Sequence, residues 1–149
     1  MEEQTQHVVA AFVRDADRIL LVEEREPVDV ISTWMLPGGR VEPDETSAQA
    51  LRRELREETG LRLVGEPALA FAVEILAPDG RYVASTFDCA TEGDVHPDDP
   101  DGLVLDASWV PAEEALRRLS CVAWYDCMPL ERYLSGDASG GATYRFEHR

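Results

Sequence analysis

The feature that most constrains the fold is a helix signal over Thr46–Thr59. Thr46 and Gln49 fit a capping box, in which each side chain accepts a hydrogen bond from the backbone N–H of the other residue. Gly60 follows the last turn, where a left-handed residue commonly ends a helix. An apolar stripe at helical spacing is formed by Ala48, Leu51 and Leu55. A helix with one apolar face needs a core to pack against.

Apolar runs of strand length occur on both sides of this helix in the sequence. We expect His7–Val13 and Ile19–Val22 to form a β-hairpin and Glu23–Ser32 to form a loop. After the helix we expect strands at Ala68–Ala77, Tyr82–Ala90 and Leu103–Val110, helices at Pro111–Leu119 and Tyr125–Leu134, and an edge strand at Thr143–Phe146. This order predicts an α/β fold with a sheet covered on two faces, in one domain over residues 1–149.

Three glutamates on the helix break the rules of helix stability. Glu54, Glu57 and Glu58 share one face, where like charges repel, and the last two lie in the last turn, where the helix dipole disfavours carboxylates. A bound cation would remove both penalties, and carboxylate oxygens suit magnesium or manganese. The alternative is a solvated acidic face, paired with Arg52, Arg53 and Arg56. For the glutamate spacing alone we favour this alternative.

The residues around the helix favour a cation-binding role for these glutamates over a solvated acidic face. Trp34–Gly39 leads into the segment 39–61, GRVEPDETSAQALRRELREETGL. This segment resembles the Nudix box, G-x5-E-x7-R-E-U-x-E-E-x-G-U, where U is a bulky aliphatic residue. The specified positions all match, at Gly39, Glu45, Arg53, Glu54, Leu55, Glu57, Glu58, Gly60 and Leu61. The sequence is therefore similar to Nudix hydrolases, and Ser108–Pro111 resembles the last core strand of that family.

The resemblance implies an α/β/α sandwich around a mixed β-sheet, and an enzyme in which water attacks a diphosphate with the help of Mg2+ or Mn2+. The metal ligands would be Glu54, Glu57, Glu58 and the carbonyl of Gly38. Family members differ in which glutamate activates water, and Glu54 is the position most often given that role. The implied role of Arg53 is to orient a glutamate, and the catalytic set is then Arg53, Glu54 and Glu57. Glu45 would support the loop.

Two further positions outside the box are candidates for the substrate site. Members of this family often take another carboxylate from a distant loop, and the acidic loop Asp94–Asp106 offers Asp101 or Asp106. Arg25 precedes the box at a place from which an arginine can contact phosphate. The alternatives are a solvated loop and an arginine paired with a neighbouring glutamate.

Composition limits the partners. The formal net charge is −16, which disfavours nucleic acid and leaves phosphate binding to a divalent cation. No apolar run approaches the ~20 residues of a membrane span, so we expect no membrane partner. The odd set of cysteines, without a C-x-x-C pair, favours a reducing cytoplasm. The resemblance also suggests a homodimer.

The box predicts the chemistry but leaves the substrate open. Nucleoside triphosphates, ADP-ribose and nucleotide sugars all carry the required diphosphate. Two other classes use the same fold: nucleotide sensors without activity, which usually lose box glutamates, and isomerases of isoprenoid diphosphates, which need a cysteine such as Cys89 or Cys121. The complete set of box glutamates favours the hydrolase.

Overall fold

The computed structural model describes residues 5–25, 32–97, 100, 102, 104–122, 125–138 and 140–147, which form two β-sheets. The larger sheet has the strand order β5-β1-β7-β6-β9. Its strands are β1 (Thr5–Phe12), β5 (Gly38–Arg40), β6 (Arg62–Ala77), β7 (Gly80–Glu92) and β9 (Ala142–Glu147). The sheet is mixed, because β1–β7 and β6–β9 are parallel pairs whereas β1–β5 and β6–β7 are antiparallel.

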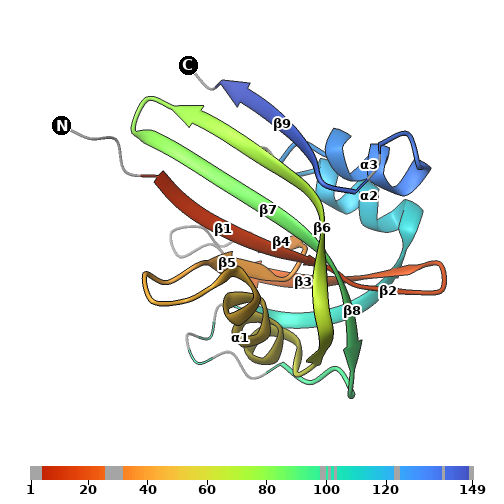
Figure 1. The fold of residues 1–149 in the computed structure, drawn as a ribbon. Coiled ribbons are helices and arrows are strands. Elements are labelled where there is room, and N and C mark those ends of the chain that lie inside the picture. Colours follow the sequence, from red (N-terminus) through yellow and green to blue (C-terminus); the bar gives the residue numbers. More distant parts are fainter. Residues whose placement is uncertain are drawn as a thin grey trace.

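The smaller sheet is antiparallel, and β3 pairs with each of its other strands. It consists of β2 (Arg14–Asp15), β3 (Arg18–Arg25), β4 (Ser32–Met35) and β8 (Val104–Pro111). The described helices are α1 (Ser47–Thr59), α2 (Ala112–Ser120) and α3 (Met128–Ser135). In Figure 1, α1 lies apart from α2 and α3, which lie close to each other.

Alternating side chains on the strands explain why the helices lie on two faces. On one face, α1 packs in a core formed by Val9, Ala11, Val13, Leu20, Ala50, Leu51, Leu55, Leu61, Leu63 and Cys89. On the other face, α2 and α3 pack in a core that includes Phe12, Ile19, Leu21, Leu36, Phe71, Val110, Leu119 and Leu130. The chain therefore has the expected α/β/α arrangement around a mixed sheet.

The sequence signals at the ends of α1 are confirmed. Thr46 is the N-cap, and both hydrogen bonds of its capping box with Gln49 are present. Gly60 ends the helix with a left-handed φ of 78°, and its N–H donates to the Arg56 carbonyl. These local caps fix where the helix starts and stops. The row of glutamates therefore has a defined position on the molecule.

The pairing expected for the first two strands is wrong. Strand β1 pairs with β7 along its whole length and with β5 on its other edge, so it has no free edge for β3. The chain passes from one sheet to the other at Val13, and only the short β2 forms a hairpin with β3. The expected loop Glu23–Ser32 is also shorter, because β3 continues to Arg25 and β4 begins at Ser32.

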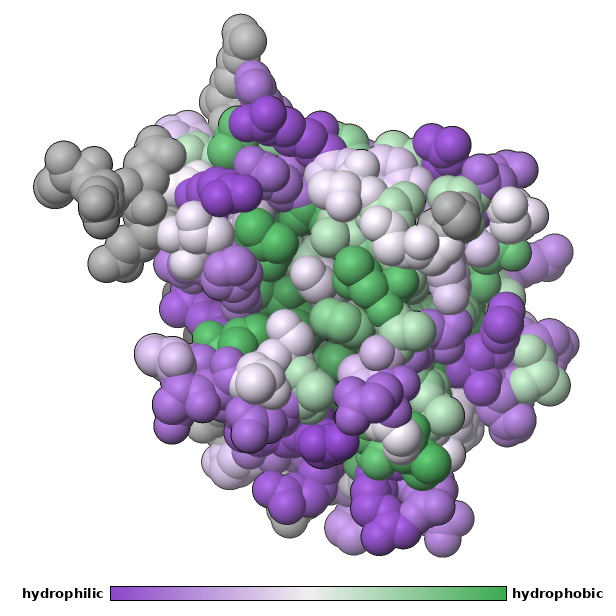
Figure 2. Space-filling model, in the orientation of Figure 1, coloured by the Kyte–Doolittle hydropathy of each residue, from purple (hydrophilic) through white to green (hydrophobic). Residues whose placement is uncertain are grey.

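The strands β1, β7 and β6 form much of the surface seen in Figure 2, where apolar side chains gather in a central hollow inside a polar rim. Among the described helices, none is both long enough and apolar enough to cross a membrane.

Replacing Gly38 tests the close contact between β5 and β1. A Cβ atom at Gly38 would clash with the Val9 carbonyl oxygen and lie 2.8 Å from the Ala10 Cα, both of them backbone atoms. We expect Gly38→Ala to lower the free energy of unfolding by about 2 kcal/mol or more, as overpacking does. Urea unfolding measures the effect.

The control for this test is Gly140→Ala. At Gly140 the nearest atom to a Cβ is the Leu69 carbonyl oxygen at 3.4 Å, so the change should cost much less. Equal stability losses in the two variants would contradict the close approach of β5 to β1.

Candidate active site

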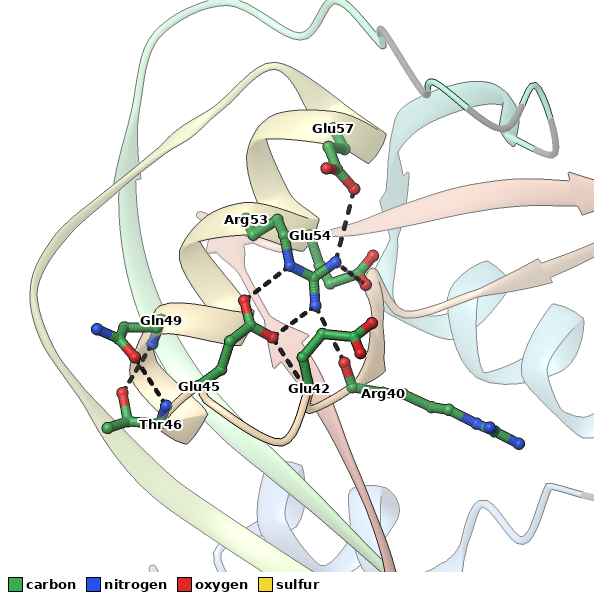
Figure 3. Close-up of polar contacts among 8 residues, drawn as sticks. All are labelled: Arg40, Glu42, Glu45, Thr46, Gln49, Arg53, Glu54 and Glu57. Atoms are coloured by element: carbon green, nitrogen blue, oxygen red, sulfur yellow. Dashed lines mark hydrogen bonds and ion pairs between the residues drawn. The ribbon is translucent and has the colours of Figure 1, made fainter.

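Arg53 connects the helix to the loop that precedes it (Figure 3). Its Nε donates to Glu45 Oε2 and its Nη2 to Glu45 Oε1, each at 2.8 Å, which forms a two-pronged ion pair. Nη2 also donates to the Arg40 carbonyl at 3.1 Å. The hydrogen bond from Arg53 lowers the pKa of Glu45 to about 2, and Glu45 in turn raises the pKa of Arg53. The loop and α1 are thus held as one unit.

The same guanidinium reaches two of the helix glutamates. Nη1 of Arg53 donates to Glu54 Oε1 at 2.8 Å and lies 3.7 Å from Glu57 Oε2. Figure 3 shows Arg53 surrounded by the carboxylates of Glu45, Glu54 and Glu57. One arginine therefore contacts three carboxylates of the box, those of Glu45, Glu54 and Glu57.

The third helix glutamate is buried. Glu58 is only 4% exposed, and its Oε1 accepts a 2.8 Å hydrogen bond from the backbone N–H of Gly38. Burial, followed by the nearby charge of Glu24, raises the pKa of Glu58 well above its ordinary value. Burial also raises the pKa of Glu54 to about 7, with Arg53 acting in the opposite direction. Two acidic groups, Glu54 and Glu58, are thus held where water is scarce.

The two glycines before the helix allow this arrangement. A Cβ atom at Gly39 would lie 2.5 Å from Oε1 of Glu54 and 2.8 Å from its carboxyl carbon. Gly38 and Gly39 pair with Ala10 and Val9 on β1, so the backbone of β5 lies between β1 and the glutamates of α1. A side chain at Gly39 would therefore displace the Glu54 carboxylate from this position.

A cavity of about 620 Å³ opens beside this backbone. Glu24, Gly38 and Gly39 form part of its wall. Most of the remaining wall is apolar and includes Met35, Leu36, Phe71, Val73, Ile75 and Phe146. A cavity of this size, with few polar groups, is typical of a small-molecule site. The glutamates of α1 therefore lie close to a space that can hold a ligand.

The chemistry of the donors fits a divalent cation, whereas their arrangement is not that of a finished site. The charge of Glu24 raises the pKa values of both Glu54 and Glu58, so these three side chains lie close together, and crowded carboxylates are suitable ligands for Mg2+ or Mn2+. Within the described part of the chain, however, no three His, Cys, Asp or Glu side chains are grouped as a cation site. Arg53 and the N–H of Gly38 take up oxygens that a cation would need.

Two of the residues predicted outside the box, Arg25 and Asp106, are exposed and do not line the cavity in the described part of the chain. Arg25 is exposed at the end of β3 and is not among the described residues that line the cavity. Asp106 is also exposed, and its Oδ1 accepts the N–H of Ala107. Asp101 lies outside the described residues. The carboxylate that sequence reasoning missed is Glu24, which alternation along β3 places on the same side as Leu20.

Comparison with known proteins identifies the family. The model of the NUDIX domain matches residues 4–126, and the chain therefore belongs to the NUDIX domain family. Human "8-oxo-dGDP phosphatase NUDT18" is 35% identical over 106 residues, which are 70% of this chain and 31% of that protein. The "CTP pyrophosphohydrolase" of Escherichia coli K12 is 48% identical over 77 residues, 51% of this chain and 55% of that protein.

The chain thus spans from about one third to about half the length of these two relatives. The solution structure of the E. coli ORF135 protein is 28% identical, with a TM-score of 0.72, and the match covers 91% of this chain and 93% of that one. Members of the family generally use divalent metal ions.

The raised pKa values of Glu54 and Glu58 predict how stability depends on pH without metal. In the folded state both groups hold a proton more tightly than in the unfolded chain, so stability is fully present below about pH 4.5 and is lost as pH rises. The lowered pKa of Glu45 makes stability depend on pH only below about pH 4.5, where this group takes up a proton. We expect urea unfolding in EDTA to show lower stability at pH 8 than at pH 5.

Glu58→Gln tests the cause of this pH dependence. The variant keeps an acceptor for the Gly38 N–H but has no charge, so its stability should change less with pH, by at least about 1 kcal/mol. An unchanged pH dependence would show that Glu58 is not the buried acid responsible.

Proposed function

We propose that this protein hydrolyses a nucleoside diphosphate linked to another group, by attack of water on phosphorus with a divalent metal ion. The observation that carries the proposal is the complete box, in which Glu54 and Glu58 lie beside Gly38 and Gly39, two residues that form part of the wall of a large cavity. A diphosphate placed along these glycines has its reacting phosphorus next to the carboxylates.

The proposed metal ligands are Glu54, Glu57 and Glu58, with the Gly38 carbonyl, and the proposed ion is Mg2+ or Mn2+. When bound, such an ion neutralises phosphate charge and lowers the pKa of the attacking water. Arg53 holds Glu54 and Glu57 in position, and Glu54 is the proposed base that accepts a proton from water. No covalent intermediate is needed, so positioning and electrostatics account for the catalysis.

The nucleoside is proposed to occupy the apolar part of the cavity. Phe71, Tyr125 and Phe146 are in its wall and offer surfaces on which a base can pack. The names of the two relatives, a phosphatase of 8-oxo-dGDP and a pyrophosphohydrolase of CTP, favour a free nucleoside di- or triphosphate. ADP-ribose and nucleotide sugars are the substrates to compare.

The remaining proposals concern the whole chain. Residues 1–149 are proposed to act as a single domain and to form a homodimer. A reducing cytoplasm is the proposed location, and the free state of Cys89, Cys121 and Cys127 supports it.

A substrate panel with box variants tests the proposed activity. The panel contains nucleoside di- and triphosphates, including oxidised ones, together with ADP-ribose, nucleotide sugars and dinucleoside polyphosphates. We expect one class to be hydrolysed with Mg2+, and we expect EDTA to abolish turnover. Glu57→Gln and Glu58→Gln should reduce kcat by about a hundredfold or more, because each removes a metal-binding charge.

The matched control is Glu113→Gln, which changes an exposed glutamate on α2 and should keep full activity. Tight binding of a nucleotide without turnover of any compound would contradict the hydrolase and favour a nucleotide sensor.

Arg53→Lys tests the orienting role of the arginine. Lysine cannot contact both oxygens of Glu45 while it also reaches Glu54, so the glutamates should lose their fixed geometry. We expect kcat to fall by roughly 10–100-fold, with a smaller change in KM. Arg56→Lys, at an exposed position on the same helix, is the control. Equal activity of the two variants would mean that Arg53 is an ordinary surface charge.

A further inference from the structure

A carboxylate outside the box, Glu24, belongs to the same cluster as the helix glutamates. It lies near the end of β3, in register with Thr33 of β4 and Val104 of β8. Side chains alternate along a strand, so Glu24 is on the same side of β3 as Leu20, which packs with Leu51 and Leu55 of α1. The strand therefore directs Glu24 toward the helix that carries the box glutamates.

The contacts of Glu24 confirm this placement. Its side chain is hydrogen-bonded to that of Glu58. Its charge also acts on Glu54, and it forms part of the cavity wall together with Gly38 and Gly39. Glu24 thus faces both the buried carboxylates and the space in which we place the diphosphate.

The pairing of β3 with β8 changes at this point. Glu23 is in register with Asp106 whereas Glu24 is in register with Val104, so the ladder contains a bulge at Leu105. Bulges redirect neighbouring side chains and are common beside active sites. The extra residue belongs to β8, whereas β3 pairs regularly with β4 through Glu24, so the alternation of side chains along β3 extends to this residue.

Packing alone gives no reason for an acid at this position. The described wall of the cavity contains no lysine or arginine, and Glu24 lies against Glu58 and near Glu54, which are acids too. Like charges held together in a place with little water destabilise the fold unless a proton or a cation joins them, and a cation takes the place of the proton at neutral pH. A glutamine would make the same hydrogen bond without this cost.

We propose that Glu24 is a further ligand of the divalent cation and reaches it from β3, opposite the glutamates of α1. This inference rests on the proposed function. The sequence predicted that Asp101 or Asp106 would supply a carboxylate from outside the box. We propose that Glu24 supplies it instead. The cation is then held between a strand and a helix that belong to different layers of the fold.

Binding of Mn2+ alone, without nucleotide, tests the proposal independently of activity. The concentration of free Mn2+ is measured from its EPR signal during a titration. The shift of Tm on adding Mn2+ is recorded in parallel. We expect Glu24→Gln and Glu58→Gln each to raise the Kd for Mn2+ at least tenfold and to reduce the Tm shift. Glu23→Gln changes the adjacent carboxylate, which alternation places on the other face of β3, and should bind within about twofold of the parent chain.

The outcomes separate this inference from the proposed function. Mn2+ binding by Glu24→Gln at the parent's affinity, with Glu58→Gln weakened, overturns the role of Glu24 and leaves the hydrolase proposal in place. Absence of Mn2+ binding in the parent chain overturns both. If Glu24→Gln does not fold, Glu24→Asp keeps the carboxylate but shortens its reach, and it should still raise the Kd. An unchanged Kd for Glu24→Asp would then count against the proposal.

Discussion

The absence of side chains at Gly38 and Gly39 is the constraint on which the site depends. It lets the backbone of β5 lie against the Val9 carbonyl on one side and against the carboxylate of Glu54 on the other. The N–H of Gly38 can then reach the buried carboxylate of Glu58. A side chain at Gly38 would meet the backbone of β1, and a side chain at Gly39 would displace the Glu54 carboxylate from its place beside β5.

The rest of the structure keeps α1 in that position. The caps at Thr46 and Gly60 define its ends, Leu51 and Leu55 are fully buried against the sheets, and Arg53 ties the helix to the preceding loop through Glu45. These contacts offset the free-energy cost of removing the acidic side chains from water. The stability of the fold and the reactivity of the site are therefore linked, because a cation that binds the glutamates also removes their mutual repulsion.

Local signals predicted α1 and most of the site, whereas contacts between distant segments did not follow from the sequence. The capping residues and the spacing of Glu54, Glu57 and Glu58 lie within one helix, so they can be found without tertiary information. Strand β1 instead pairs with β7, far along the chain, and nearby apolar runs wrongly predicted a hairpin. Glu24 was missed because charged residues after Val22 favoured a loop, although the alternation of β3 extends to it.

Crystals grown with Mn2+ test most directly whether these elements together hold a divalent cation. Anomalous scattering from the crystals locates the bound ion. We expect a peak within coordination distance of the Glu58 carboxylate and close to Gly38. We also expect the Glu54 carboxylate to turn away from Arg53 toward the ion. A peak only in the acidic loop after β7, with Arg53 still bound to Glu54 and no density beside Glu58, would contradict the account.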